Sequence, residues 1–363
     1  MVNKAPRILI MPGGTGGHVY TALAVAQRLR KQGVEVVWLG TQRGLEASVV
    51  PAADFPINYI SVAGLRGKGV QSWLWAPFKL IYAVSQAFML LLKQRPDAVL
   101  GLGGFVTGPG GLATWLQRRP LLIHEQNAIP GLTNRILSRL ARCVMEAFPG
   151  SFAASAAALH TGNPVRQEIL DLPEPQRRFA QRQGQMRVLV IGGSLGAQAL
   201  NENLPKALAL LSTDHRPEVW HQTGKAKLEV TRQHYAQADV DARVVAFIDD
   251  MAEAYAWADL VICRAGALTI SELAAAGVAS VLIPFPYAVD DHQTHNAQYL
   301  VRANAAIAIQ QSELTAEKLA TVLKELLSKG RTHLLAMAQN ARSMAMPDAT
   351  RHVAEKCLEV AHA

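Results

Sequence analysis

The chain has 363 residues, more than one ordinary domain, so two domains are expected. Half of the residues are hydrophobic and 18% are charged, a composition typical of globular proteins and not of disordered ones. The net charge of +8 favours acidic partners such as nucleotides or an anionic membrane surface; nucleic acid is not expected, because the basic residues are spread out and match no motif for it. The three cysteines have neither disulfide nor metal-ligand spacing, and the N-terminus leads straight into a predicted strand. We therefore expect reduced thiols in a cytosolic protein without a signal peptide.

The first predicted elements are a buried strand, a glycine-rich loop and a helix. The strand is Ile8–Ile10, the loop reads Gly13-Gly-Thr-Gly-Gly-His18, and the apolar residues of Val19–Leu29 recur at helical spacing. This order points backbone N–H groups and the positive end of the helix dipole at an anion. His18 stands where it would touch a ligand held by the loop; the alternative is that it only caps or orients the loop.

Three further segments follow the first predicted helix. Gly33–Gly40 is predicted as the second strand of a βαβ unit, which indicates a parallel sheet, and Ile57–Val62 as a third strand. The loop Gly64–Gly69 carries two cations, and the sequence leaves open whether it binds an anion or is a solvated turn.

Trp73–Leu92 is the most apolar stretch of the chain, with about the minimum length for a membrane span. Pro77, Lys79 and the flanking α/β units argue against crossing. We expect its second half to be a core helix. The first half places aromatic rings near cations, a pattern typical of peripheral contact with an anionic membrane; these rings belong to Trp73, Trp75 and Phe78.

Two more strands in this half end in candidate ligand segments. The strand after Pro96 runs into a second glycine loop, Gly103–Gly111, with a helix expected from Leu112. The strand after Pro120 ends in His124-Glu-Gln-Asn127. Ligands bind at the carboxyl ends of parallel strands, so both segments are candidates, although His124 alone could equally be a buried, hydrogen-bonded histidine.

The pattern then starts again, which places the domain boundary near residues 163–166. Residues 187–197 repeat the order of strand, glycine loop and helix. The strand Ala258–Cys263 leads into Arg264-Ala-Gly-Ala, and we expect a helix from Thr269 with Glu272 in its first turn. A strand predicted from residue 279 is followed by a polar segment at 290–296. The tail from residue 315 is predicted to be helical and is interrupted by a proline.

Several enzyme classes are excluded by motif. The glycine loops miss G-x-G-x-x-G, which disfavours a nicotinamide dehydrogenase, and no P-loop motif is present. Asp239 and Asp241 mimic a metal motif of some sugar transferases, but they lack partners at ligand spacing and are interpreted as a solvated turn. No zinc or calcium motif occurs, so no metal site is predicted.

Six motifs together resemble the MurG family, bacterial transferases that move N-acetylglucosamine (GlcNAc) from UDP-GlcNAc onto lipid I. They occur in order from Ile8 to the C-terminal helix, with no large insertion: Gly13–His18, Gly103–Pro109, His124–Asn127, Gly162–Arg166, Gly192–Gly196 and Arg264–Glu272. The resemblance implies an α/β GT-B fold of two Rossmann-like, doubly wound domains facing a central cleft. Residues 1–163 would face the acceptor and membrane, residues 164–345 would bind UDP-GlcNAc, and the helix at about 346–363 would pack back on the first domain.

The resemblance also implies site residues. The donor would be bound by Arg166 and Ser194 at the diphosphate, Phe247 and Ile248 at uracil, Ala267, Leu268, Thr269, Ile270 and Ser271 at the phosphates and sugar, Glu272 at the ribose, and Gln293 at GlcNAc. GlcNAc and the acceptor would meet Thr15, Gly16, Gly17 and Asn127, and the lipid I diphosphate would meet Gly103, Gly104 and Gly108. An inverting reaction needs a base, for which His18 is the first choice and Glu125 the second.

The implied function is the synthesis of lipid II for peptidoglycan, at the cytoplasmic face of the bacterial inner membrane, by a peripheral enzyme without a fixed cofactor. Whether a divalent ion assists stays open, as do cell-wall and division proteins as further partners. Two alternatives remain: a UDP-GlcNAc 2-epimerase-like enzyme, and a non-catalytic scaffold that binds nucleotide sugars.

Overall fold

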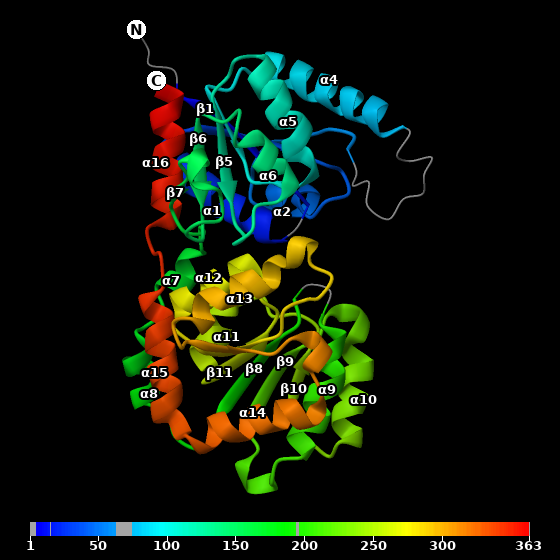
Figure 1. Cartoon of the computed structure of the whole chain (residues 1–363), viewed down its shortest axis with the longest axis vertical. Helices are drawn as coiled ribbons and strands as arrows, with labels where there is room; N and C mark the ends of the chain where they lie inside the picture. The colour runs from blue at the N-terminus through cyan, green and yellow to red at the C-terminus, as the bar shows by residue number, and fades with distance from the viewer. Residues whose placement is uncertain (1–4, 15, 63–74, 194–195, 363) are drawn as a thin grey trace. The chain divides into compact units, whose positions relative to one another are not determined.

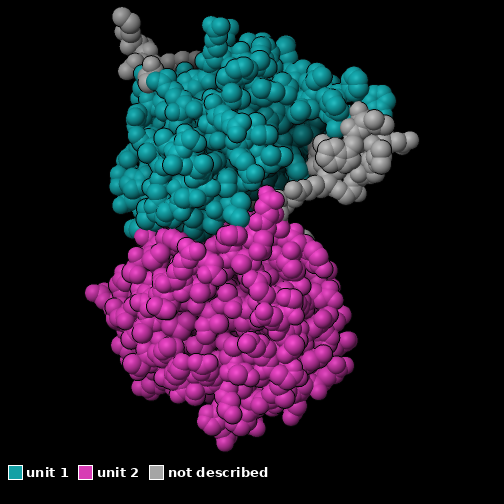
Figure 2. Space-filling view, viewed as in Figure 1, with its two compact units in different colours: residues 1–165, 346–363 teal, residues 166–345 magenta. Residues whose placement is uncertain are grey.

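The computed structural model describes residues 5–14, 16–62, 75–193 and 196–362. The chain divides into two compact units, coloured separately in Figure 2. Unit 1 consists of residues 1–165 and 346–363, and unit 2 of residues 166–345. The division lies within residues 163–166, where the sequence predicts the domain boundary.

The described part of unit 1 contains a seven-stranded parallel sheet in the order β3-β2-β1-β4-β5-β6-β7. Its strands are β1 (Arg7–Met11), β2 (Glu35–Gly40), β3 (Ile57–Tyr59), β4 (Ala98–Gly101), β5 (Leu121–Glu125), β6 (Cys143–Glu146) and β7 (Leu159–His160). The helices are α1 (Gly16–Lys31), α2 (Glu46–Ala52), α4 (Ala76–Gln94), α5 (Gly104–Leu116), α6 (Leu132–Leu137) and α16 (Ala349–His362). The chain order reverses between β1 and β4, where a doubly wound sheet binds ligands.

The alternation of side chains along β1 explains why helices cover both faces of this sheet (Figure 1). Ile8 and Ile10 belong to a core shared with α1 and α16, whereas Leu9 and Met11 belong to a core shared with α4, α5 and α6. The C-terminal helix α16 thus completes unit 1, although it follows unit 2 in the sequence.

The described part of unit 2 contains a six-stranded parallel sheet in the order β10-β9-β8-β11-β12-β13. Its strands are β8 (Arg187–Ile191), β9 (Glu218–Gln222), β10 (Arg243–Val245), β11 (Leu260–Cys263), β12 (Ala279–Leu282) and β13 (Ala306–Ala308). The helices are α7 (Gln167–Leu170), α8 (Pro175–Ala180), α9 (Gln198–Ala209), α10 (Leu228–Gln237), α11 (Met251–Trp257), α12 (Ala267–Ala276), α13 (His292–Val301), α14 (Ala316–Ser328) and α15 (Gly330–Ser343). The order is that of a Rossmann fold, with its reversal between β8 and β11.

Two helices begin earlier than the sequence predicted. The second glycine loop is largely helical, because α5 begins at Gly104 and not at Leu112. Likewise α12 begins at Ala267 instead of Thr269, which moves Glu272 from the first turn into the second. Both helices begin with glycine or alanine residues. Because these side chains are absent or small, the spacing of large hydrophobic residues does not show that the helix has begun.

Helix α4 is long and apolar enough to cross a membrane by length and composition, yet little of it is buried. Its buried residues, Ala83, Ala87 and Leu91, are four apart and form one stripe against unit 1. The expectation that its second half is a core helix is wrong, since Met89 is 65% exposed there. The exposed side of α4 is largely apolar and includes Trp75, Phe78, Ile81, Tyr82 and Met89. Lys79, Ser85 and Lys93 are exposed as well.

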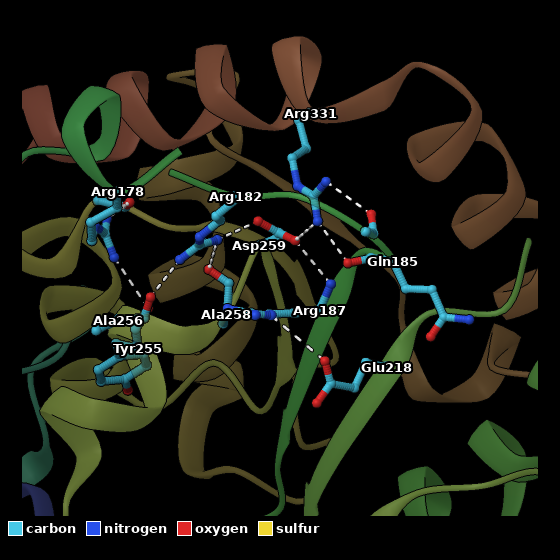
Figure 3. A network of polar contacts seen from close by, with 12 residues as sticks. Arg178, Arg182, Gln185, Arg187, Glu218, Tyr255, Ala256, Ala258, Asp259 and Arg331 are labelled. Carbon is cyan, nitrogen blue, oxygen red and sulfur yellow. Dashed lines mark hydrogen bonds and ion pairs between the residues drawn. The ribbon is translucent and has the colours of Figure 1, made fainter. Parts of the chain in front are cut away.

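An arginine cluster around Asp259 ties together the beginnings of β8 and β11 (Figure 3). The fully buried Asp259 carboxylate pairs with Arg182, accepts the Arg187 backbone N–H at 2.9 Å, and accepts Arg331 Nη2 at 3.3 Å. Arg331 also donates to the Gln185 carbonyl at 2.6 Å. This cluster lies at the N-terminal ends of the strands, whereas the glycine loops follow their C-terminal ends. We therefore assign it a structural role, the stabilisation of unit 2.

Candidate functional site

Two glycine-rich segments of unit 1 touch backbone to backbone at the β1–β4 reversal. A Cβ on Gly13 would lie 2.2 Å from Gly104 Cα, and a Cβ on Gly104 would lie 2.3 Å from Gly13 Cα. Gly104 also has a φ of +80°, a left-handed conformation that side chains disfavour. Thr107 Oγ1 fixes the junction by lying 2.8 Å from the Met11 carbonyl and 2.7 Å from the Gly103 carbonyl. Gly13 and the start of α5 are therefore in direct backbone contact.

His18 stands at this junction, in the first turn of α1, and is half-buried. Its Nδ1 lies 2.8 Å from the Gly13 carbonyl oxygen, which only accepts hydrogen bonds. We therefore assign the neutral ring a proton on Nδ1, which puts the basic lone pair on Nε2. That nitrogen lies 3.5 Å from the position that a Cβ on Gly103 would take. The ring thus holds its proton-accepting nitrogen against the second glycine segment.

Glu125, the second base candidate, is 2% exposed and holds the loop that follows β5. Its Oε1 accepts the backbone N–H of Asn127 at 2.9 Å and the Asn127 side-chain amide at 3.1 Å. Its Oε2 accepts the Gly131 N–H at 3.1 Å and Asn134 Nδ2 at 2.9 Å. Both oxygens are engaged in the fold, so the carboxylate acts as a brace and the same contacts place Asn127.

His124 is a buried, hydrogen-bonded histidine, the structural alternative that the sequence left open. Its Nε2 lies 3.0 Å from the Gly162 carbonyl, and its Nδ1 lies 2.9 Å from Gln126 Nε2. An amide donor on one side and a carbonyl on the other fit a neutral ring. Burial lowers the pKa of His124 to about 4, so it carries no charge near neutral pH.

In unit 2, the glycine loop after β8 packs on the end of β9. A Cβ on Gly196, whose φ is +70°, would lie 1.8 Å from the Thr223 carbonyl oxygen. The buried Gln222 braces this loop: its Oε1 accepts the Gly192 N–H at 3.1 Å, and its Nε2 donates to the Gly193 carbonyl at 2.9 Å.

The loop before α12 is held in the same way by two side chains of α13. Gln293 Oε1 accepts the backbone N–H groups of Phe285, at 2.9 Å, and Ala265, at 3.2 Å. Asn296 Nδ2 donates to the Ala265 carbonyl at 3.2 Å. The loop thereby delivers Gly266 as the N-cap residue of α12, and the first N–H groups of that helix, from Ala267 onward, form an anion-binding end.

Glu272, one turn into α12, is 6% exposed and is held by two partners. Arg166 Nη2 lies 3.0 Å from its Oε1, and the Tyr255 hydroxyl donates to its Oε2 at 3.0 Å. Burial raises the pKa of Tyr255 well above its usual value, so that its hydroxyl remains a donor. Burial also raises the pKa of Glu272, and the Arg166 guanidinium opposes that rise. The carboxylate is thus oriented while retaining lone pairs for hydroxyl donors.

The structure separates the predicted site residues into two groups, one in each unit. Unit 1 brings together Gly16, Gly17, His18, Gly103 and Gly104, whereas Glu125 and Asn127 belong to the neighbouring loop after β5. Gly108 lies inside α5, where its N–H belongs to the helix ladder, so the structure removes it from the anion contacts. Unit 2 brings together Arg166, Glu272, Gln293 and the start of α12, where the Ser271 hydroxyl donates to the Ala267 carbonyl at 3.1 Å.

The remaining predicted residues are placed more simply. After β10, Phe247 is 56% exposed, and the next residue, Ile248, is buried. Thr15, Ser194 and Trp73, and the loop 64–69, lie outside the described residues. Within the part of the chain that the structure describes, no three His, Cys, Asp or Glu side chains are grouped so as to hold a metal ion.

Sequence reasoning assigned no role to the residues that position this site: Asn134, Gln222, Tyr255 and Asn296, of which Asn296 was noted only as part of the polar segment 290–296. Each is buried or nearly so, and each acts on a segment distant in sequence. The only available signal was a polar residue within an apolar helix or at a strand end, which applies to Gln222 after Val219 and Trp220 in β9.

Comparison with known proteins agrees with this architecture. Residues 8–146 match the glycosyltransferase family 28 N-terminal domain, and residues 187–353 match the glycosyltransferase family 28 C-terminal domain. A Nitrosococcus oceani protein named UDP-N-acetylglucosamine--N-acetylmuramyl-(pentapeptide) pyrophosphoryl-undecaprenol N-acetylglucosamine transferase is 58% identical over 98% of this chain and 99% of its own length. A protein of the same name from Marinobacter nauticus is 55% identical over 98% of both chains.

A solved structure agrees as well. The crystal structure of Acinetobacter baumannii MurG superposes with a TM-score of 0.83 at 44% identity, covering 98% of this chain and 99% of that one. With two parallel α/β units that match the N- and C-terminal domains of one family, the predicted GT-B fold is confirmed. The chain therefore belongs to glycosyltransferase family 28, as a member of its MurG family.

Proposed function

We propose that this protein transfers GlcNAc, with inversion, from UDP-GlcNAc to the 4-hydroxyl of N-acetylmuramate in lipid I, forming lipid II for peptidoglycan. The observation that carries the proposal is the identity of 58% to a transferase of that name, spread over almost the whole of both chains. The geometry fits it, since each unit presents an anion-binding helix start at the reversal of its sheet.

The donor belongs on unit 2. The diphosphate would lie at the start of α12, against the N–H groups of Ala267, Leu268 and Thr269, with Ile270 and Ser271 in the same helix. Glu272 would accept the ribose hydroxyls, Gln293 would donate its amide to GlcNAc, and uracil would pair with the Ile248 backbone beside the Phe247 ring. Ser194 remains a proposed diphosphate contact. Arg166 takes a second role, because its pairing with Glu272 holds the carboxylate in place as well as adding positive charge for the phosphates.

The acceptor belongs on unit 1. The N–H groups of Gly103 and Gly104 at the start of α5 would hold the lipid I diphosphate. Thr15, Gly16, Gly17 and Asn127 would then contact GlcNAc and the acceptor sugar. His18 is the base that deprotonates the attacking hydroxyl, since its Nε2 bears the lone pair in the assigned tautomer.

The reaction builds positive character at the anomeric carbon and negative charge on the departing UDP. The base must act on the face opposite to the leaving group for the configuration to invert. The N–H groups at the start of α12, together with Arg166, stabilise the developing diphosphate charge. No fixed cofactor enters this scheme, and a transfer assay with and without chelator tests for a divalent ion.

The decisive experiment compares His18→Ala with Glu125→Gln in a radiolabelled GlcNAc transfer assay on a lipid I analogue. His18→Ala should lower turnover more than ~100-fold while UDP-GlcNAc binding survives. Glu125→Gln removes a structural acceptor, so it should lower thermal stability yet keep the wild-type shape of the pH–rate profile. Near-normal turnover of His18→Ala, or loss in Glu125→Gln of the rise in rate with pH that reports deprotonation of the base, would remove His18 from the base role.

Assays on the same purified protein distinguish the proposed function from the two alternatives. An epimerase would convert UDP-GlcNAc alone into UDP-ManNAc, and a scaffold would bind the donor without transferring GlcNAc. We expect transfer that depends on the lipid I analogue, and no UDP-ManNAc.

We further propose that the enzyme sits peripherally on the cytoplasmic face of the bacterial inner membrane, using the exposed apolar face of α4. Single exposed apolar residues are common, but a cluster of large exposed apolar side chains on one helix marks a contact surface. Trp73 is the remaining ring of the predicted anchor. Replacing Trp75, Phe78 and Ile81 by Ser should release the protein from anionic vesicles without changing its thermal stability; replacing exposed Leu210 and Val230 of unit 2 by Ser is the control.

A further inference from the structure

Gln222, the last residue of β9, lies between the glycine loop after β8 and the segment after β10. Strand β9 runs parallel to β8 on one side and to β10 on the other, so the carboxyl ends of all three lie at one edge of the sheet. The loop after β8 contains Ser194, a proposed diphosphate contact, and the segment after β10 contains Ile248, the proposed uracil contact. The Gln222 side chain is 3% exposed and contacts both segments.

The amide group of this one side chain bonds to both neighbours. Its Oε1 accepts the Gly192 N–H at 3.1 Å, and its Nε2 donates to the Gly193 carbonyl at 2.9 Å. The same Nε2 donates to the Ala246 carbonyl, on the other side of β9, at 3.1 Å. An amide nitrogen carries two N–H groups, enough to donate to one carbonyl on each side. The glycine loop and the segment that leads into Phe247 are therefore tied to the same group.

The fold does not need this side chain to satisfy the backbone groups that it contacts. Each of them also has a backbone partner at 2.9 to 3.1 Å: the Gly192 N–H has the Gln222 carbonyl, the Gly193 carbonyl has the Gly196 N–H, and the Ala246 carbonyl has the Gly224 N–H. Removing the side chain would leave none of these groups without a partner, which limits the cost in stability. What the side chain adds is the link between the two segments.

We propose that Gln222 couples recognition of the nucleotide base to binding of the diphosphate, an inference that rests on the donor site proposed above. Uracil bound at the Ile248 backbone fixes Ala246, two residues earlier, and the Gln222 amide then fixes Gly193, next to Ser194. Each half of the nucleotide thereby orders the subsite of the other half, and the effect is reciprocal. Because Gln222 is buried and acts through these two segments, it is a positioning residue.

The test measures how uridine and inorganic diphosphate, alone and together, displace a fluorescent UDP-GlcNAc analogue from the full chain. No lipid acceptor is present, and displacement of the analogue reports the donor site only, so that diphosphate bound to unit 1 does not count. In the wild type each fragment should raise the affinity for the other about 5-fold. Gln222→Met has a side chain of similar length without a hydrogen-bond donor, and there the factor should fall to about 1. Its affinity for UDP should fall by the same factor, while its affinity for uridine alone stays at the wild-type value.

Gln222→Glu is the second variant, because it keeps the acceptor for the Gly192 N–H and loses both donors; it should uncouple the fragments as well. Tyr235→Phe is the matched control, since it removes a buried hydrogen bond of 2.9 Å to His221, the residue before Gln222, without contact to either segment. It should lower the unfolding temperature and keep the coupling.

Fragments that bind independently in the wild type would overturn the proposal, and so would coupling that survives in both Gln222 variants. Coupling lost in Tyr235→Phe would assign the effect to general loosening of unit 2 and would overturn it too. A wild-type protein that does not bind the UDP-GlcNAc analogue would instead refute the proposed function itself.

Discussion

The buried histidines His124 in unit 1 and His221 in unit 2 should make the stability of each unit depend on pH. Burial lowers the pKa of His124 in unit 1 to about 4 and that of His221 in unit 2 to about 3. His221 is held between the Tyr235 hydroxyl at 2.9 Å and Asn201 Oδ1 at 3.1 Å. Both rings stay neutral in the fold at a pH at which the unfolded chain, with an ordinary histidine pKa near 6.5, already binds a proton.

Stability should therefore fall as pH drops from about 6.5 towards 4, and the full contribution is present only above 6.5. Each histidine costs about 1.4 kcal/mol per pH unit inside this window, or about 2 kcal/mol by pH 5. Urea unfolding at pH 7.5 and 5 measures the loss, and His124→Gln should reduce the slope with pH even if it lowers stability overall. An unchanged slope in that variant would contradict the assignment.

Among single residues, the sequence predicted those that belong to a motif. It did not predict the residues that hold the motif residues in place through hydrogen bonds. His18 and Glu272 follow glycine-containing loops, so their position in the sequence already indicates a functional role. Tyr255 and Gln222 are ordinary residues whose roles arise only when folding brings them to Glu272 and Gly193, 17 and 29 positions away. Periodicity and motif spacing carry no information about such contacts.

At the scale of elements, the junction of the first loop with α5 depends on the absence of side chains. Gly104→Ala would place a methyl group 2.3 Å from Gly13 Cα, and neither backbone can move without shifting β1 or α5. We expect this variant to lose most transfer activity and to unfold at clearly lower temperature, as measured by transfer assay and calorimetry.

Gly33→Ala is the matched control, because Gly33 has a similar φ of +79° but nothing within 4 Å of a Cβ. It should cost only about 1 kcal/mol from the left-handed conformation, with activity kept. Equal losses in the two variants would mean that backbone strain, and not the close approach of the two loops, explains Gly104.

Strands and helices were predicted better than the points where they begin. Apolar runs located the strands that precede the glycine loops, because buried parallel strands are continuously apolar. Helix starts failed at Gly104 and Ala267, where small residues show no periodicity. The burial of α4 was predicted wrongly for another reason. Its composition is that of a core helix, and only the packed structure shows that the covered residues are the single stripe Ala83, Ala87 and Leu91.

At the scale of the whole molecule, the chain repeats one sheet order in two units and then returns to the first. The sequence predicted the repetition because each half begins with the same strand, loop and helix. It gave no physical reason for the return of the C-terminal helix, which only the resemblance implied. The structure supplies one: Val353, Ala354, Cys357 and Val360 are buried in the core of α1 and β1.

Truncation after Ala345 should therefore destabilise unit 1, although the residues removed follow unit 2. Without α16, the face of the sheet formed by Ile8, Ile10 and Leu100 loses its cover, and the exposed apolar area favours unfolding. Hydrogen exchange read by mass spectrometry should show faster exchange in β1, β4 and α1, while β8, β11 and β12 keep their protection. Val353→Ser should reproduce the pattern more weakly, whereas Lys356→Ser, whose side chain is only partly covered and pairs with Glu359, should not. Protection that falls equally in both sheets would instead make the two units one cooperative structure, and unchanged protection in β1 would leave α16 without a structural role.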